Sequence, residues 1–189
     1  MGVRNFLVEG RSGSGKTTVC DELLRRGYQA IHGDRVLAYQ GDPETGEPDP
    51  VTSEIPNGSG HPRNCDCTEC LAWLDKRWIW NLDRVRSLIA DQDEPMTFFC
   101  GGARNVSKII DLFDGVFILT VDLETLLQRL ARRPEDEFGG RQSERDFVGR
   151  LYPTSEGIPS DGIVINTDRP VEQVVDEIIR HAEAIGTLT

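Results

Sequence analysis

The chain carries Gly10-Arg11-Ser12-Gly13-Ser14-Gly15-Lys16-Thr17 near its start, a match to the pattern G-x-x-x-x-G-K-[ST]. Glycines at this spacing let backbone N–H groups curl around phosphate oxygens, and the helix that follows points its positive N-terminus at the same anion. Lys16 would reach the terminal phosphates of a nucleotide, and the Thr17 hydroxyl would bind Mg²⁺. A strand-like run at residues 5–9 precedes the motif and a helical pattern at 16–26 follows it, as the motif requires.

Strand-like and helical segments alternate along the rest of the chain. The further strand-like runs lie at residues 28–32, 96–100, 116–121 and 162–166. Helices are expected at residues 71–90, where Trp78, Leu82, Val85 and Ile89 form one apolar stripe, at 106–113, at 123–130 and after Pro170. This alternation predicts an α/β fold, with a mostly parallel sheet and helices on both of its faces. Residues 1–189 are expected to form a single domain.

Two segments depart from the alternation. Residues 40–72 are rich in Pro, Gly, Asp and Glu and contain three closely spaced cysteines, which indicates a loop or an insertion. Residues 132–146 are polar and contain Gly139-Gly140, which indicates a second irregular segment. Long loops in a compact domain are usually functional or disordered, so both segments are candidates for a role in binding.

Composition excludes several classes of function. Lys and Arg number 21 against 32 Asp and Glu, a formal net charge of −11 at pH 7. Such a charge disfavours nucleic acid and anionic membrane surfaces as partners. No apolar run is long enough for a membrane span, and no export signal is present, so a cytoplasmic protein is expected. Five cysteines without a secretory context predict free thiols, with Cys20 and Cys100 as buried apolar residues.

With this motif, size and strand count, the sequence resembles the P-loop NTPases, and among them the small kinases similar to adenylate, shikimate and gluconate kinases. The resemblance covers nearly the whole chain. It implies a three-layer fold around a five-stranded parallel sheet of order 2-3-1-4-5, an acceptor-side insertion at 40–72 and a lid at 132–146. It also implies ATP with Mg²⁺ as ligands. The implied ATP-binding residues are Gly10, Ser12, Gly13, Ser14, Gly15, Lys16, Thr17, Thr18 and Arg132.

Polar residues and glycines follow the other strands, at the sheet edge where open parallel sheets bind ligands. In the kinases resembled here, Asp34 would orient or deprotonate the acceptor; the alternative is a turn cap. Gly101 and Gly102 lie in a turn similar to the glycine-rich turn of shikimate kinases, although Ala103 replaces its third glycine. There Gly101, Gly102 and Arg104 would bind the acceptor; the alternative is an ordinary strand–helix turn.

Arginines crowd the end of the helix at 123–130. Arg132 or Arg133 would belong to the lid and neutralise charge during transfer; the alternative is an interaction with the helix dipole. Trp80 falls outside the apolar stripe of the helix expected at 71–90. It would line the acceptor pocket by stacking, or else pack beneath the insertion.

The insertion holds four candidate metal ligands within ten residues, namely His61, Cys65, Cys67 and Cys70. A Cys₃His set suits tetrahedral Zn²⁺, which would act as a local structural clip. A C-x-C-x₂-C triplet is less specific than paired C-x₂-C motifs, and three thiols without a metal are the equal alternative.

Together these features favour an ATP-dependent small-molecule kinase, with Lys16, Asp34, Arg132 and Arg133 as catalytic residues. The acceptor is expected to be a nucleoside or nucleoside monophosphate, and less readily a sugar acid or a shikimate-like hydroxy acid. The alternative is a nucleotide-dependent switch or binding module whose zinc-ordered insertion binds a partner. A monomer or a homodimer is expected.

Overall fold

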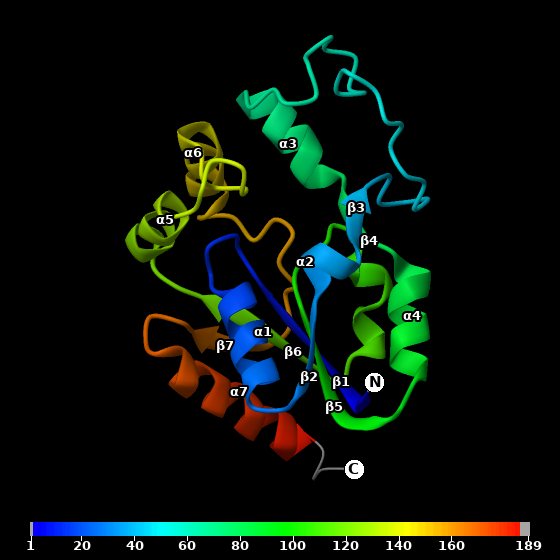
Figure 1. The fold of residues 1–189 in the computed structure, drawn as a ribbon, viewed down its shortest axis with the longest axis vertical. Helices are drawn as coiled ribbons and strands as arrows, with labels where there is room; N and C mark the ends of the chain where they lie inside the picture. Colours follow the sequence, from blue (N-terminus) through cyan, green and yellow to red (C-terminus); the bar gives the residue numbers. More distant parts are fainter. Residues whose placement is uncertain (1, 186–189) are drawn as a thin grey trace.

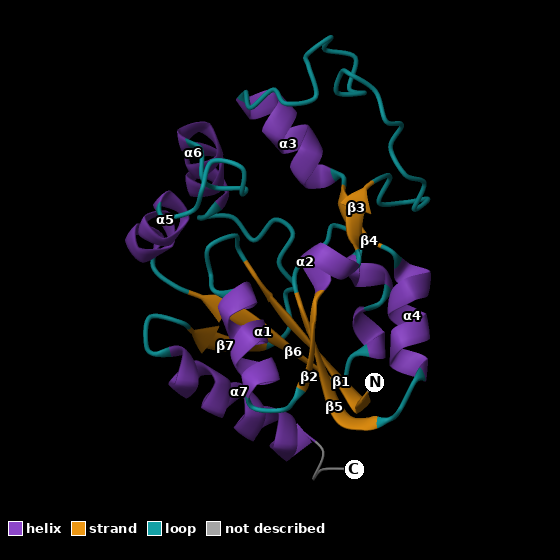
Figure 2. Cartoon of the chain, viewed as in Figure 1, coloured by secondary structure: helices purple, strands orange, loops and turns teal. Residues whose placement is uncertain are grey.

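The structure is a computed structural model that describes residues 2–185. Its centre is a parallel sheet of five strands: β1 (Gly2–Gly10), β2 (Gln29–His32), β5 (Glu94–Cys100), β6 (Gly115–Thr120) and β7 (Ile163–Asn166). The strand order is β2-β5-β1-β6-β7 (Figures 1 and 2). Counted along the chain, this is the order 2-3-1-4-5, so the predicted fold and topology are confirmed.

Strand β1 lies in the middle of the sheet, between two strands that come much later in the chain. Phe6 stands opposite Phe98 of β5 on one side and opposite Gly115 of β6 on the other. The run Phe6-Leu7-Val8 is fully buried, because helices cover both faces of a parallel sheet. Glu9 and Gly10 therefore emerge at the centre of the sheet's carboxyl edge.

The helices are α1 (Lys16–Arg25), α2 (Gly33–Val36), α3 (Thr68–Lys76), α4 (Leu82–Ala90), α5 (Leu123–Ala131), α6 (Gln142–Leu151) and α7 (Val171–Ile185). Successive side chains of a strand point to opposite faces. Phe6 and Val8 accordingly pack in one cluster with residues of α1 and α7, while Leu7 packs in another with Val85 of α4. None of the described helices is long and apolar enough to cross a membrane.

The single helix expected at residues 71–90 is wrong. The chain instead forms α3, which ends at Lys76, then strand β4 (Trp78–Trp80), and then α4. β4 pairs antiparallel with β3 (Ala38–Gln40), in a small second sheet above the edge of the main one. Trp78 and Val85 consequently belong to different elements and do not share a helical stripe.

Local chemistry explains this break. Aromatic and β-branched residues favour extended chain, and Trp78-Ile79-Trp80 contains nothing else. Asn81 then begins a new helix, because its side chain accepts a hydrogen bond from the backbone N–H of Arg84 (2.9 Å). The apolar spacing that predicted one helix therefore comes from a strand, which holds Trp78, and a following helix, which holds Leu82, Val85 and Ile89.

The helix expected at 106–113 is also replaced, by two short 3₁₀ turns, η1 (Val106–Lys108) and η2 (Ile110–Leu112). Backbone bonds here span three residues, such as Ile109 N–H to Val106 O (3.0 Å). Val106, Ile109 and Ile110 are β-branched and lose rotamer freedom in an α-helix, which weakens it relative to the tighter turns.

Two groups of elements rise above the carboxyl edge of the sheet. Helix α3, the β3–β4 pair and the loops of residues 41–67 stand on one side, and helices α5 and α6 on the other (Figure 1). They approach each other at their outer ends, where α3 contacts α6. A cavity lies in the space between them.

Candidate functional site

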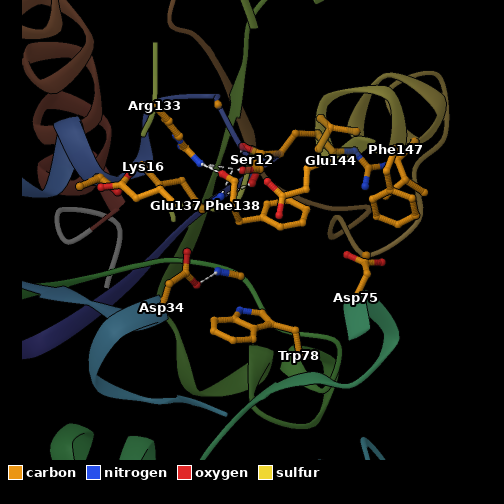
Figure 3. A pocket seen from close by; sticks show the side chains of 18 of the residues that line it. Ser12, Lys16, Asp34, Asp75, Trp78, Arg133, Glu137, Phe138, Glu144 and Phe147 are labelled. Atoms are coloured by element: carbon orange, nitrogen blue, oxygen red, sulfur yellow. Dashed lines mark hydrogen bonds between the residues drawn. The ribbon is translucent and has the colours of Figure 1, made fainter. Parts of the chain in front are cut away.

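The cavity has a volume of about 960 Å³ and lies where the strands end. Its floor is the turn 10–18 together with Glu9, Asp34 and Gly102. Figure 3 shows Asp34 and Trp78 on one side, with Arg133, Phe138 and Phe147 across from them. This volume suits a nucleotide-sized ligand together with a second small molecule.

The turn 10–18 has the conformation of a phosphate cradle. Gly13 and Gly15 adopt left-handed φ angles of 89° and 104°, which a residue with a side chain rarely tolerates. Helix α1 begins at Lys16, directly after this turn, so its N-terminus faces the cradle. The structure thus brings together the predicted residues from Gly10 to Thr18, and all of them except Ser14 line the cavity.

Lys16 is folded back onto this turn. Its ammonium group donates to the carbonyl oxygens of Gly10 (2.5 Å) and Arg11 (3.4 Å). The hydroxyl of Ser14 is buried and has no hydrogen-bond partner among the described residues. Backbone N–H groups, a lysine ammonium and a threonine hydroxyl in one turn form the donor set that a nucleotide phosphate with Mg²⁺ needs, so the residues fit that pair.

Two arginines reach the cradle from the end of α5, and Arg132 is not one of them. Arg133 donates to Ser12 Oγ (3.2 Å) and to the carbonyl of Phe138 (2.6 Å). Arg129 donates to Thr167 Oγ1 (3.0 Å) and lines the same cavity. Arg132, predicted to bind ATP, is exposed and does not line the cavity, so the structure places Arg133 and Arg129 at the cradle instead. Burial lowers the pKa of Arg133, although the group stays charged.

Asp34 and the glycine turn after β5 are joined directly. The backbone N–H of Gly102 donates to Asp34 Oδ1 (3.0 Å). A Cβ atom at Gly101 would stand only 2.7 Å from that same oxygen, which explains why a glycine is required there. Gly102 lines the cavity, whereas Gly101 supports the turn from behind.

Glu9 was not identified from the sequence. It is the second-last residue of β1, and its side chain is buried. Its Oε1 accepts a hydrogen bond from the N–H of Gly10 (3.1 Å). Its Oε2 has no hydrogen-bond partner among the described residues. A Cβ atom at Gly102 would collide with its carboxyl group. Burial raises the pKa of Glu9 to about 8, and the nearby Lys16 ammonium opposes this shift. The signal in the sequence was a lone carboxylate ending an apolar strand.

The two tryptophans of β4 exchange the roles predicted for them. Trp80 is fully buried, does not line the cavity, and packs against Gly33 and Gly101, so the prediction that it contacts the acceptor is wrong. Trp78, expected in the core, lines the cavity instead. The two residues lie two apart along β4, and Trp80 is the one that packs over Gly33 and Gly101.

Arg104 lines the cavity but is already paired. Its guanidinium forms an ion pair with the Asp75 carboxylate and donates to the Asp75 carbonyl oxygen (3.1 Å). Burial raises the pKa of Asp75, and Arg104 opposes the shift. Arg104 therefore fixes the end of α3 against the turn after β5, in addition to offering positive charge to the cavity.

The four predicted metal ligands converge. The ligand atoms of His61, Cys65, Cys67 and Cys70 all lie within 4.8 Å of one another. His61 Nδ1 stands 3.1 Å from Cys70 Sγ and 3.6 Å from the sulfur atoms of Cys65 and Cys67. Three thiols and an imidazole are ligands that Zn²⁺ prefers, so this group can hold a zinc ion. Cys65 also lines the wall of the cavity.

Comparisons with known proteins agree with this fold. Residues 7–148 match the family described as AAA domain. A gluconokinase from Sinorhizobium meliloti 1021 is similar over 98% of this chain and 97% of its own, with 18% identity and a TM-score of 0.53. Shikimate kinase from Bacteroides thetaiotaomicron is similar over 95% of this chain and 98% of its own, with 14% identity and a TM-score of 0.58. A search of curated protein sequences finds no match.

Proposed function

The chain belongs to the AAA domain family, and we propose that it is a kinase that transfers the γ-phosphoryl group of ATP to a small molecule. One observation carries the proposal: the phosphate cradle and the carboxyl groups of Glu9 and Asp34 line the same cavity. A kinase must hold the phosphoryl donor and the acceptor hydroxyl side by side, because positioning and charge stabilisation supply most of its catalysis.

On the nucleotide side, the proposed ligands are ATP and Mg²⁺. Lys16 would exchange its bonds to the Gly10 and Arg11 carbonyls for bonds to the terminal phosphates, and Thr17 would hold Mg²⁺. Arg133, already above Ser12, would neutralise the charge on the transferring group. A second metal, Zn²⁺, is proposed for the His–Cys cluster as a structural ion with no part in the transfer.

On the acceptor side, two carboxyl groups stand at the floor of the cavity. Asp34, fixed by Gly102, would orient the acceptor hydroxyl and receive its proton as the new oxygen–phosphorus bond forms. Glu9 lies on the other side of Gly102 and would add negative charge once ionised. Gly102 itself would let the acceptor approach the backbone.

The proposed acceptor is a nucleoside or a nucleoside monophosphate. The aromatic rings of Trp78, Phe138 and Phe147 line the cavity, and such rings stack on flat bases (Figure 3). Arg63 and Arg104 also line the cavity and would suit an anionic group of the acceptor. A sugar acid or a shikimate-like hydroxy acid is the second choice, because it would use the arginines and leave the rings without a partner.

A nucleotide-dependent switch is the alternative, and one observation favours it. The insertion presents a loop segment, residues 51–64, whose side chains are mostly exposed, as a partner-binding surface would be. A switch would bind nucleotide, but no small acceptor would stimulate the conversion of ATP to ADP.

The test is to measure ADP release from Mg-ATP in the presence of nucleosides, nucleoside monophosphates, sugar acids and shikimate-like hydroxy acids. We expect one of the first two classes to stimulate ADP release. A flat response across the panel, with nucleotide binding established by titration calorimetry, would favour the switch instead.

Lysine variants test whether the observed turnover belongs to this site. Lys16→Ala should lose acceptor-stimulated ADP release by at least about 100-fold, because it removes a donor to the transferring group. Lys76→Ala is the matched control, since Lys76 is exposed and does not line the cavity. Equal turnover in both variants would show that the phosphoryl transfer does not take place at the site around Lys16.

We also propose that the protein works in the cytoplasm. All five cysteines are free thiols in the structure, and reducing compartments keep thiols in that state. Every group that the proposed site uses comes from one chain, so a monomer or a homodimer would both serve.

A further inference from the structure

The four ligand atoms of the His–Cys cluster lie within 4.8 Å of one another, and the distances from the histidine nitrogen to the three sulfur atoms are close to those of a tetrahedral zinc site. Zinc bonds at about 2.3 Å to sulfur and about 2.0–2.1 Å to nitrogen require ligand atoms about 3.6–3.8 Å apart. The distances from His61 Nδ1 to the sulfur atoms of Cys65 and Cys67, 3.6 Å each, agree with this requirement. The distance to Cys70 Sγ is 3.1 Å, so these two atoms would have to move apart by about half an ångström.

The segment that carries the His–Cys cluster buries few apolar side chains that could stabilise its conformation. The first part of the insertion is anchored by Arg77, which pairs with Asp49 and Asp42. In the second part, residues 51–67, the only apolar side chain buried among the described residues is Ile55. Burial of so little apolar surface cannot offset the entropy of ordering that many residues, whereas metal binding can.

The cluster stands where the insertion meets helix α6. Asp66, between two of the cysteines, accepts a hydrogen bond from Ser143 Oγ (2.7 Å). Thr68, directly after Cys67, accepts one from Arg150 Nη2 (2.9 Å). Both donors lie on α6, and both acceptors lie within one residue of Cys67, so the position of this backbone decides whether the two bonds form.

These contacts close the outer end of the cavity. Cys65 and Asp66 line it from the insertion, and Glu144 and Phe147 line it from α6. Figure 3 shows Phe147 on the side of the cavity away from Lys16. The joined segments therefore form a wall of the cavity that is remote from the phosphate cradle.

We propose that His61, Cys65, Cys67 and Cys70 form a zinc site that fastens the insertion to helix α6 across the mouth of the cavity. The ion fixes the Cys65–Cys70 backbone, and that backbone presents Asp66 and Thr68 to Ser143 and Arg150. Loss of the ion frees both partners and opens the outer wall. Neither the metal site nor the fastening rests on the proposed kinase activity.

The test measures metal content and hydrogen exchange on the whole protein, with no substrate present. We expect about one zinc per chain by elemental analysis. Zinc should be lost in the double variant Cys65→Ser/Cys67→Ser and after treatment of the wild-type protein with a strong chelator. Amide exchange in residues 142–151 should then rise roughly tenfold or more, because two hydrogen bonds that hold α6 are lost.

Two further variants separate the metal from the fastening. Ser143→Ala/Arg150→Ala should retain zinc yet show the same faster exchange in α6. Glu69→Gln is the control, since Glu69 is exposed, lies between two of the cysteines, and is not one of the converging ligands; it should retain both zinc and slow exchange. A wild-type protein that neither contains nor takes up Zn²⁺ would overturn the metal site. Unchanged exchange in α6 after zinc removal would overturn the fastening.

Discussion

Glu9 links the chemistry of the cavity to the stability of the fold. Burial raises the pKa of this carboxyl to about 8 from an ordinary value of 4.5, with Lys16 acting in the opposite direction. Between these pH values the folded protein holds a proton that the unfolded chain releases. The stabilisation from Glu9 is therefore complete below about pH 4.5 and is lost as the pH rises through about 8.

Replacement of this carboxyl by an amide should remove that pH dependence. In the wild-type protein, the Glu9 contribution to the free energy of unfolding should fall by roughly 2 kcal/mol between pH 5.5 and 7.5. The Glu9→Gln side chain cannot ionise. The change in its free energy of unfolding between pH 5.5 and 7.5, measured by urea denaturation, should therefore be smaller than the wild-type change by about that amount. Glu137→Gln, an exposed glutamate at the same cavity, should behave as wild type. Parallel pH curves for wild type and Glu9→Gln would show that Glu9 is ionised in both states.

The neighbouring arginines at the end of α5 provide a matched pair. Arg133 contacts Ser12 and Phe138, whereas Arg132 is exposed and outside the cavity. Arg133→Ala should reduce acceptor-stimulated turnover roughly 100-fold, because it removes a positive donor from the cradle, and Arg132→Ala should leave it within about threefold. Steady-state kinetics with the acceptor found in the panel measure both turnover rates. A larger loss in Arg132→Ala than in Arg133→Ala would identify Arg132 as the arginine that acts in the transfer.

At the level of the elements, the break between β4 and α4 can be tested by whether a substitution at Asn81 lowers or raises the free energy of unfolding. Asn81 caps α4, so Asn81→Ala should lower the free energy of unfolding by about 1 kcal/mol. If residues 71–90 formed one helix, Asn81 would lie in its interior, and alanine there would stabilise the protein by a few tenths of a kcal/mol or more. Urea denaturation gives the sign, and Asp122→Ala, at the equivalent cap of α5, is the positive control.

The elements also show which features a sequence can reveal. The phosphate cradle and the five strands were predictable because each depends on a local pattern of glycines or apolar residues. The roles of Trp78 and Trp80 were not, because they depend on pairing between β4 and β3, some forty residues away in the chain. Glu9 was overlooked for a related reason: its burial comes from the turn at Gly102, which reaches it only in the folded sheet.

For the whole molecule, nucleotide binding should appear as added stability. A ligand that binds only the folded state at 100 times its dissociation constant adds about 2.7 kcal/mol. Mg-ADP at that excess should raise the melting temperature by several degrees, and the shift should vanish in Lys16→Ala and persist in Lys76→Ala. Differential scanning fluorimetry measures this without knowledge of the acceptor. A full shift in Lys16→Ala would mean that ADP binds elsewhere.

The place of β1 in the sheet has a consequence for biosynthesis. This strand is synthesised well before its two neighbours, because β5 and β6 lie roughly ninety or more residues further along the chain. At about 5–20 residues per second, the apolar run Phe6-Leu7-Val8 waits on the order of 5–20 s for a partner. During translation this run is a segment that chaperones would bind, and the phosphate cradle beside it cannot take shape until β5 and β6 have been made.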